Sequence, residues 1–113
     1  MPSEVNRILT EARNLIADPA RWTQEAYARN DRGYHVDSTH PTACCWCASG
    51  AMCRVNGPEP DSDIWTACIK NMREACAELF PHMSGFVAVN DHGTHADILK
   101  VFDRAIEMEA ANA

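Results

Sequence analysis

Apolar residues recur every three to four positions in three stretches of the chain, which is the spacing of an amphipathic helix. This pattern predicts helices over 4–17, 62–80 and 95–110. Residues suited to capping a helix stand at or near each start: Ser3, Asp61 or Ser62, and Thr94 with Asp97. The three segments therefore combine a helical repeat with a helix start signal.

Residues 43–53 carry no charged side chain, and a further helix is predicted over 43–55 with Thr42 as its cap. A helix that is apolar all round is buried all round, so this segment is expected to be the central helix. Its side chains are mostly small. Gly50 would cost about 1 kcal/mol relative to alanine inside a helix, which suggests a close backbone contact there.

Two other segments contain strand-forming residues. A β-hairpin with arms at 22–29 and 34–36 is predicted around a turn at 30–33, while a helix over 19–29 is the alternative. The short apolar run 86–89 predicts a strand or a buried extended segment, followed by a turn at 90–93.

These elements predict a mainly α (α+β) fold. We expect one domain over 1–113, with four helices around the buried helix at 43–55 and a small β-hairpin between the first two helices. The length is enough for a single hydrophobic core, and 46% hydrophobic with 23% charged residues is typical of globular proteins.

The charge balance bears on the kind of partner. Ten basic and 16 acidic residues give a net charge of −6, which argues against direct nucleic-acid binding because phosphate contacts need clustered lysine and arginine.

The N-terminal residues lack the apolar run of a secretory signal, and no stretch is suited to span a membrane, so a cytoplasmic protein is expected. Thiols stay reduced in that compartment. Four of the six cysteines also lie within 44–53, at spacings poorly placed for disulfides, so free thiols are predicted.

Three motifs stand out along the chain: Arg-Trp-Thr-Gln-x-Ala-Tyr-Ala-Arg at 21–29, Trp-Cys-Ala-x-Gly-Ala at 46–51, and Asn-Asp-x-x-Thr-His-Ala-Asp-Ile-Leu at 90–99. In this combination and order, the chain resembles a family of small bacterial and phage proteins with a domain of unknown function. The resemblance implies no activity. It implies a location in the cytoplasm of a bacterial cell or of a phage-infected host. The family pattern has one cysteine, at the position of Cys47, so a metal site using Cys44 would not be shared by the family.

The first candidate chemistry is a thiol nucleophile. Cys47 would lie near the start of the helix predicted over 43–55, where the helix dipole lowers a thiol pKa. His92 or His95 could act as its base, and Asp91 could orient that histidine, as a thiol-dependent hydrolase or transferase requires. The alternative interpretation is that Cys47 is a small buried residue of the core.

The second candidate is zinc. Cys44 and Cys47 form a Cys-x2-Cys pair, and His92 and His95 form a His-x2-His pair, a ligand set that zinc commonly takes. His35 and His40 are alternative ligands. The alternative interpretation is that the cysteines are core residues and that the histidines belong to a turn and a helix start. A protein without a cofactor is the main expectation.

The third candidate is a partner-binding surface. Acidic residues cluster at Glu59, Asp61 and Asp63, and again at Asp103, Glu107 and Glu109. Such a face can dock on a basic surface of a protein partner, as small inhibitors do. The alternative is a solvated face that keeps the protein soluble. Aromatic residues could form a further patch or could pack the hairpin onto the helices: Trp22, Tyr27, Tyr34, Trp46 and Trp65. A small acidic binding or regulatory protein is the function that the sequence favours over an enzyme.

Overall fold

The structure is a computed structural model that describes residues 3–59 and 61–111. Five helices, a 3-10 turn and two short strands follow one another in the described residues. In chain order they are α1 (Glu4–Leu15), η1 (Pro19–Arg21), β1 (Ala28–Arg29), β2 (Cys45–Trp46), α2 (Ala48–Asn56), α3 (Ser62–Leu79), α4 (Phe86–His92) and α5 (His95–Ala111). The predicted mainly helical class with a small antiparallel sheet is confirmed.

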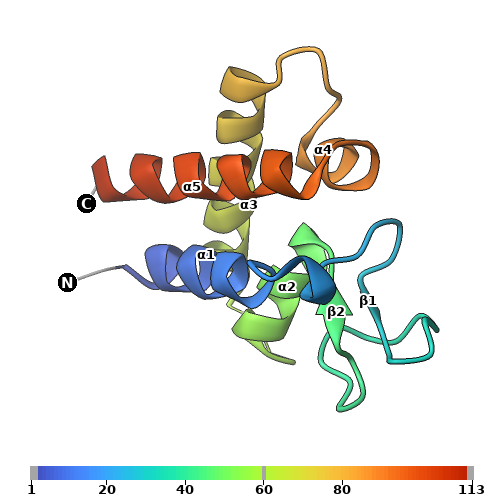
Figure 1. Ribbon diagram of the computed structural model, residues 1–113. Helices are drawn as coiled ribbons and strands as arrows, with labels where there is room; N and C mark the ends of the chain where they lie inside the picture. Colours follow the sequence, from blue (N-terminus) through green and yellow to red (C-terminus); the bar gives the residue numbers. More distant parts are fainter. Residues whose placement is uncertain (1–2, 60, 112–113) are drawn as a thin grey trace.

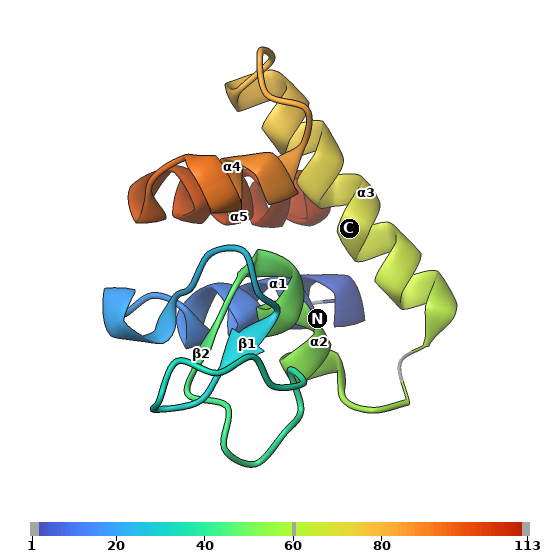
Figure 2. The ribbon, with the colours of Figure 1, turned by 90° about the vertical axis from the view of Figure 1, so that its right-hand side faces the viewer.

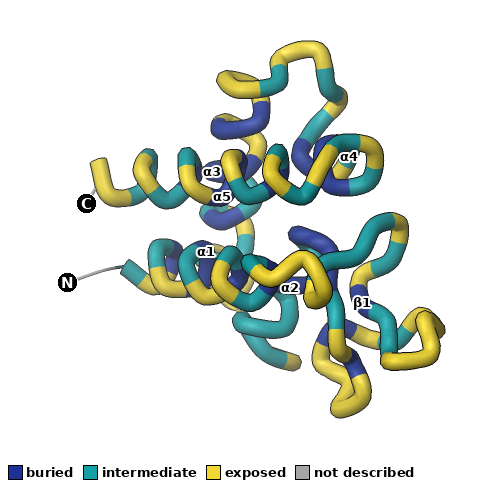
Figure 3. The backbone as a smooth tube through the Cα atoms, viewed as in Figure 1, coloured by how far each residue is buried: buried dark blue, intermediate teal, exposed yellow. Residues whose placement is uncertain are grey.

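The helices form two layers that α3 joins. Helices α1 and α5 lie side by side, and α3 crosses behind both of them (Figure 1). Turned by 90°, the molecule shows α4 and α5 in one layer and α1, α2 and the strands in the other (Figure 2). The core lies where α1, α3 and α5 meet, and the buried stretches face it (Figure 3). Its largest fully buried side chains include Ile8, Leu9, Met72, Val101 and Phe102.

The three helices predicted from the apolar repeat are confirmed, with ends that differ by no more than two residues. Their caps form as the sequence predicts. The Ser3 hydroxyl accepts a hydrogen bond from the Asn6 N–H at 3.0 Å. Thr94 and Asp97 form a reciprocal pair, in which each side chain accepts a hydrogen bond from the other's N–H. Local signals were sufficient because each of these helices has both a cap and a continuous apolar face.

The helix predicted over 43–55 begins five residues later, at Ala48, and Cys47 rather than Thr42 is its N-cap. Residues 45 and 46 instead form β2, because Trp46 is held outside the helix. Its indole N–H donates to the Ser38 carbonyl at 2.9 Å, and its own carbonyl accepts from the Thr23 N–H at 3.0 Å. Residues 3–59 and 61–111 thus contain five α-helices rather than the predicted four, and α1 and α5 occupy the centre instead of the predicted central helix.

The predicted hairpin is correct only near its turn. Strand β1 pairs antiparallel with β2, while the second arm approaches β1 through a single bridge between Arg29 and His35. Residues 22–27 do not form a strand because their polar groups bond to α4 and β2. The alternative helix over 19–29 is also wrong, apart from the single turn η1.

The strand or buried extended segment predicted at 86–89 is wrong, because these residues form the first half of α4. Phe86, Val89 and Asn90 are all buried, and their spacing of three and four residues matches one face of a helix. The predicted turn at 90–93 is the last turn of α4 with Gly93 as its C-cap. A four-residue apolar run does not distinguish the two conformations by itself.

No helix within the described residues is both long enough and apolar enough to cross a membrane.

The close contact predicted at Gly50 is present. A β-carbon at this position would overlap the Tyr27 carbonyl oxygen, and that oxygen also accepts a hydrogen bond from the Cys47 N–H at 3.2 Å. The backbone of residue 27 therefore rests on the first turn of α2, and the missing side chain at Gly50 is what allows it.

We predict that Gly50→Ala lowers the free energy of unfolding by about 1–3 kcal/mol, because steric overlap with the chain outweighs the better helix propensity of alanine. Urea unfolding measures the effect. Ser49→Ala, at the preceding residue of α2, is the control without steric overlap. Ser49 is half-buried, and its replacement by a better helix former should change the stability by less than about 0.5 kcal/mol. Equal stability of the Gly50→Ala variant and the wild type would contradict this account of Gly50.

Candidate functional site

The side-chain amide of Asn90 joins three segments that are far apart in the sequence. Asn90 is only 1% exposed. Its Oδ1 accepts hydrogen bonds from the Trp22 indole N–H at 2.8 Å and from the Ala48 backbone N–H at 3.0 Å. Its Nδ2 donates to the Thr23 carbonyl at 3.1 Å and to the Asp91 carboxylate at 3.0 Å. The loop after η1, the first residue of α2 and the end of α4 therefore meet at one buried group.

Gln24 and Glu25, which follow Thr23 in the loop, also bond to the end of α4. Gln24 donates from Nε2 to the Asn90 carbonyl at 3.1 Å and to the Gly93 carbonyl at 3.3 Å. The Glu25 N–H donates to Asp91 Oδ1 at 2.9 Å, and Glu25 has a φ of +62°. A left-handed backbone is uncommon for a residue other than glycine, so the bond to Asp91 holds Glu25 in a strained conformation.

These contacts bring the three sequence motifs together, because residues 21–29, 46–51 and 90–99 all contribute to them. Asn90 was expected in a turn, and this role was not predicted for it from the sequence. The one available signal was its distance of four residues from Phe86, which would have placed it on the buried face of a helix.

Cys47 stands at the point where β2 ends and α2 begins. As the N-cap residue, it accepts a hydrogen bond on Sγ from the Gly50 N–H at 3.3 Å, and it is 9% exposed. Burial raises the pKa of the Cys47 thiol. The Gly50 and Ser49 N–H groups lower the pKa, whereas the negative charge of Asp91 raises it further. The net direction is upward, so the thiol is protonated at neutral pH.

A pocket of about 970 Å³ opens beside Cys47. Its wall combines carboxylates, two histidines and apolar groups from the loop 25–27, from the segment 35–40 and from the facing parts of α2 and α4. The lining residues are Glu25, Ala26, Tyr27, His35, Val36, Asp37, His40, Cys47, Ala48, Ser49, Val87, Asn90 and Asp91. Three of these residues are acidic, and none is lysine or arginine.

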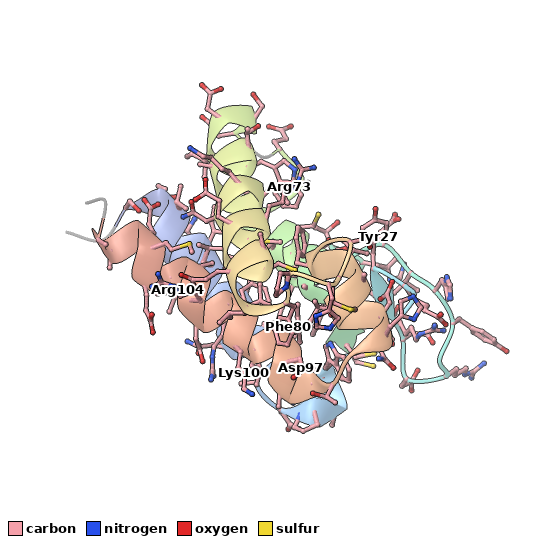
Figure 4. All side chains as sticks on the ribbon, turned by 90° about the horizontal axis from the view of Figure 1, so that it is seen from above. Tyr27, Arg73, Phe80, Asp97, Lys100 and Arg104 are labelled. Carbon is pink, nitrogen blue, oxygen red and sulfur yellow. The ribbon has the colours of Figure 1, made fainter. Side chains whose placement is uncertain are left out.

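A second groove of about 830 Å³ lies on the other side of Ser49, Val87 and Asp91, which line both hollows. Arg73 of α3 and His92 of α4 line the second groove. Seen from above, Tyr27 and Arg73 lie on one side of the molecule and Lys100 on the other (Figure 4). The two hollows are therefore neighbours that share the Asp91 carboxylate, and only the second contains a guanidinium.

The residues predicted for a thiol enzyme are only partly brought together. Cys47 and Asp91 line the first pocket, whereas His92 lines the second groove and His95 lines neither. The Nε2–H of His95 donates to the Ile16 carbonyl at 2.6 Å, and its ring packs against Trp22 with the centroids 5.3 Å apart. The histidines that share the pocket with Cys47 are His35 and His40.

The four predicted zinc ligands lie on different elements. Cys44 contacts the Arg29 carbonyl, Cys47 caps α2, His92 ends α4, and His95 contacts the residue after α1. Residues 3–59 and 61–111 contain no group of three or more His, Cys, Asp and Glu side chains arranged to hold a metal ion. This arrangement therefore does not support zinc binding, which stays a prediction from the sequence.

The predicted acidic surface is exposed at the start of α3. Glu59, Asp61 and Asp63 are all exposed, and the Asp61 carboxylate caps α3 by accepting from the Asp63 and Ile64 N–H groups at 2.9 and 3.1 Å. The second acidic group is engaged within the molecule. Asp103 accepts a hydrogen bond from Arg13, Glu107 accepts one from Arg104, and Glu109 accepts from Ser3 and Asn71.

The aromatic residues divide into two sets. Trp46 is buried under Arg54, whose guanidinium lies 5.4 Å from the ring centroid, while Trp22 and Trp65 pack against the core. Tyr27 and Tyr34 are 64% and 65% exposed, so these two do not pack the loop onto the helices.

The burial of the cysteines predicts their order of reaction. All six are free, and the pKa of both the Cys44 and the Cys47 thiol is raised, but Cys44 is exposed whereas Cys47 is buried. With a chromogenic disulfide reagent at pH 7, we expect Cys44 to react at least about tenfold faster than Cys47, because reaction needs an accessible thiolate. Cys44→Ser should remove the fast phase and Cys47→Ser should leave it unchanged. A fast phase lost in Cys47→Ser would show that Cys47 is activated.

Comparison with known proteins places this fold in a family. The sequence pattern described as "Family of unknown function (DUF6197)" matches residues 1–108. No curated protein and no solved structure matches the chain. Because the match covers nearly the whole sequence, including all residues of the pocket, the chain belongs to this family of unknown function.

Proposed function

We propose that the protein is a small binding module whose pocket beside Cys47 receives a positively charged side chain of a protein partner. The observation that supports this is the uncompensated acidity of the pocket. Its wall contains Glu25, Asp37 and Asp91 without lysine or arginine, and none of these three carboxylates forms an ion pair within residues 3–59 and 61–111. Other acidic side chains, such as those of Asp103 and Glu78, pair with an arginine.

A concave wall of one charge sign suits a cation. Low-dielectric walls focus the field of such a cleft and raise the local concentration of the opposite charge. Ala26, Val36 and Val87 provide apolar surface beside the carboxylates. The methylene stem of a lysine or arginine packs on such surface while its charged end reaches the carboxylates. The pocket thus matches both parts of a long basic side chain.

The backbone that carries one of the carboxylates is set in advance. Glu25 is held by its backbone bond to Asp91 in a left-handed conformation. Backbone strain of this kind occurs at ligand-binding sites, where it fixes a group before the ligand arrives. Less conformational freedom is then lost on binding. The net charge of −6 adds a long-range attraction to a basic surface, and docking on such a surface as an inhibitor is the most specific form of this proposal.

An enzyme with Cys47 as nucleophile is the alternative class. Cys47 lines the pocket together with Asp91, His35 and His40, which is the observation in its favour. The raised pKa of the Cys47 thiol argues against it, because a thiol nucleophile acts as the thiolate.

Binding of a fluorescently labelled tetra-arginine peptide at low ionic strength, followed by fluorescence anisotropy, tests the proposal. We expect Glu25→Gln with Asp37→Asn to weaken binding by about tenfold, since each lost charge pair contributes a fraction of a kcal/mol to about 1 kcal/mol. Glu59→Gln with Asp63→Asn is the matched control, because it changes the net charge equally on the acidic surface at α3. This control should leave the affinity within about twofold.

Three outcomes would contradict the proposal. Absence of binding to the wild type would remove the cation site. Equal weakening in both double variants would mean that only the net charge matters. Weakening in the Glu59 and Asp63 variant alone would place the partner on the start of α3 instead.

A further inference from the structure

Two adjacent thiols lie outside the pocket and take no part in the proposed function. Cys44 is exposed and precedes β2, and Cys45 is the half-buried first residue of that strand. The other four cysteines lie in or against helices. Cys47 caps α2, Cys53 lies within α2, and Cys68 and Cys76 are buried in α3.

The two sulfur atoms converge on one backbone oxygen. The Arg29 carbonyl accepts from Cys44 Sγ at 3.5 Å and from Cys45 Sγ at 3.8 Å. Consecutive side chains in a regular strand point to opposite faces, but Cys44 is placed ahead of the strand, where its N–H also donates to the Arg29 carbonyl at 2.9 Å. The pairing of Arg29 with Cys45 in the sheet fixes this arrangement.

The thiols also interact with each other. Desolvation raises the pKa of the Cys44 thiol, and the Cys45 thiol raises it further, both through its charge when ionised and through a hydrogen bond. Asp31 acts in the same direction and Arg21 in the opposite one. The geometry is the stronger observation: both sulfur atoms lie within 3.8 Å of the Arg29 carbonyl oxygen, on the same side of the strand pair where one thiophilic atom can reach both.

We propose that Cys44 and Cys45 form a dithiol site that binds a soft, thiophilic centre through two sulfur atoms. Backbone geometry favours a ligand atom that bridges the two sulfur atoms over a disulfide bond formed directly between them. Adjacent Cα atoms are about 3.8 Å apart across a trans peptide, whereas disulfides usually need about 4.4–6.8 Å. An atom inserted between the sulfurs enlarges the ring and relieves this constraint. The described residues add no third His, Cys, Asp or Glu ligand, so the ligand class is one satisfied by two thiolates.

Phenylarsine oxide is the probe for this class, because its trivalent arsenic takes two thiols. One As–S bond forms to Cys44 and one to Cys45, the As–O double bond breaks, and its oxygen leaves as water with the two thiol protons. Arsenic stays trivalent and no oxidant is needed. We expect one phenylarsenic group per chain by intact mass, bound reversibly. A dithiol such as 2,3-dimercaptopropanol should remove it, and an equal concentration of a monothiol should not.

Single substitutions identify the two sulfurs. Cys44→Ser and Cys45→Ser should each raise the concentration for half-saturation at least tenfold, since the second bond is intramolecular only when both thiols are present. Cys53→Ser is the control and should bind like the wild type. Circular dichroism checks the fold of each variant. If Cys45→Ser does not fold because residue 45 is half-buried, the binding measured with Cys44→Ser tests the proposal by itself. Failure of the wild type to bind, or unchanged binding by Cys44→Ser, would overturn the proposal.

Discussion

The buried amide of Asn90 is the constraint on which the described structure depends. It bonds to Trp22, Thr23 and Ala48 from inside the protein, where a polar group left without partners would cost about 1–3 kcal/mol. The loop after η1, the start of α2 and the end of α4 can satisfy this amide only in one mutual arrangement. A buried polar network whose members are all satisfied specifies a single packing more strictly than apolar contacts do.

The pocket follows from that arrangement. Once Asn90 holds the start of α2, the Cys47 N–H and the bare backbone of Gly50 both meet the carbonyl of Tyr27. Asp91, the neighbour of Asn90 in the sequence, holds Glu25 at the rim. The same contacts that join the three motifs therefore also form the wall of the hollow and place its acidic groups. In this account the motifs determine the framework, and the pocket charge determines what binds.

The sequence predicted those elements whose signals are local. Helices α1, α3 and α5 have long apolar faces and caps made by their own residues, such as Ser3 and Thr94. Helix α4 was missed because its apolar run is too short to reveal a period. Strand β2 was missed because Trp46 is fixed by Ser38 and Thr23, which no local pattern encodes.

The candidate site was predicted in the same partial way. Cys47 and Asp91 were identified from their motifs, and both line the pocket. Glu25 and Asp37 were missed because their importance comes from where the chain folds, not from their neighbours in sequence. His95 was a candidate base by spacing alone, yet Trp22 and Ile16 hold it away from Cys47.

A double-mutant cycle between Trp22→Phe and Asn90→Ala tests the central role of the Asn90 amide most directly. The free energies of unfolding of the wild type, both single variants and the double variant would be measured in urea. If the indole and the amide act as one network, their coupling energy should be about 1–3 kcal/mol. Effects that add within about 0.3 kcal/mol would show that the two residues stabilise the protein independently and would contradict this account.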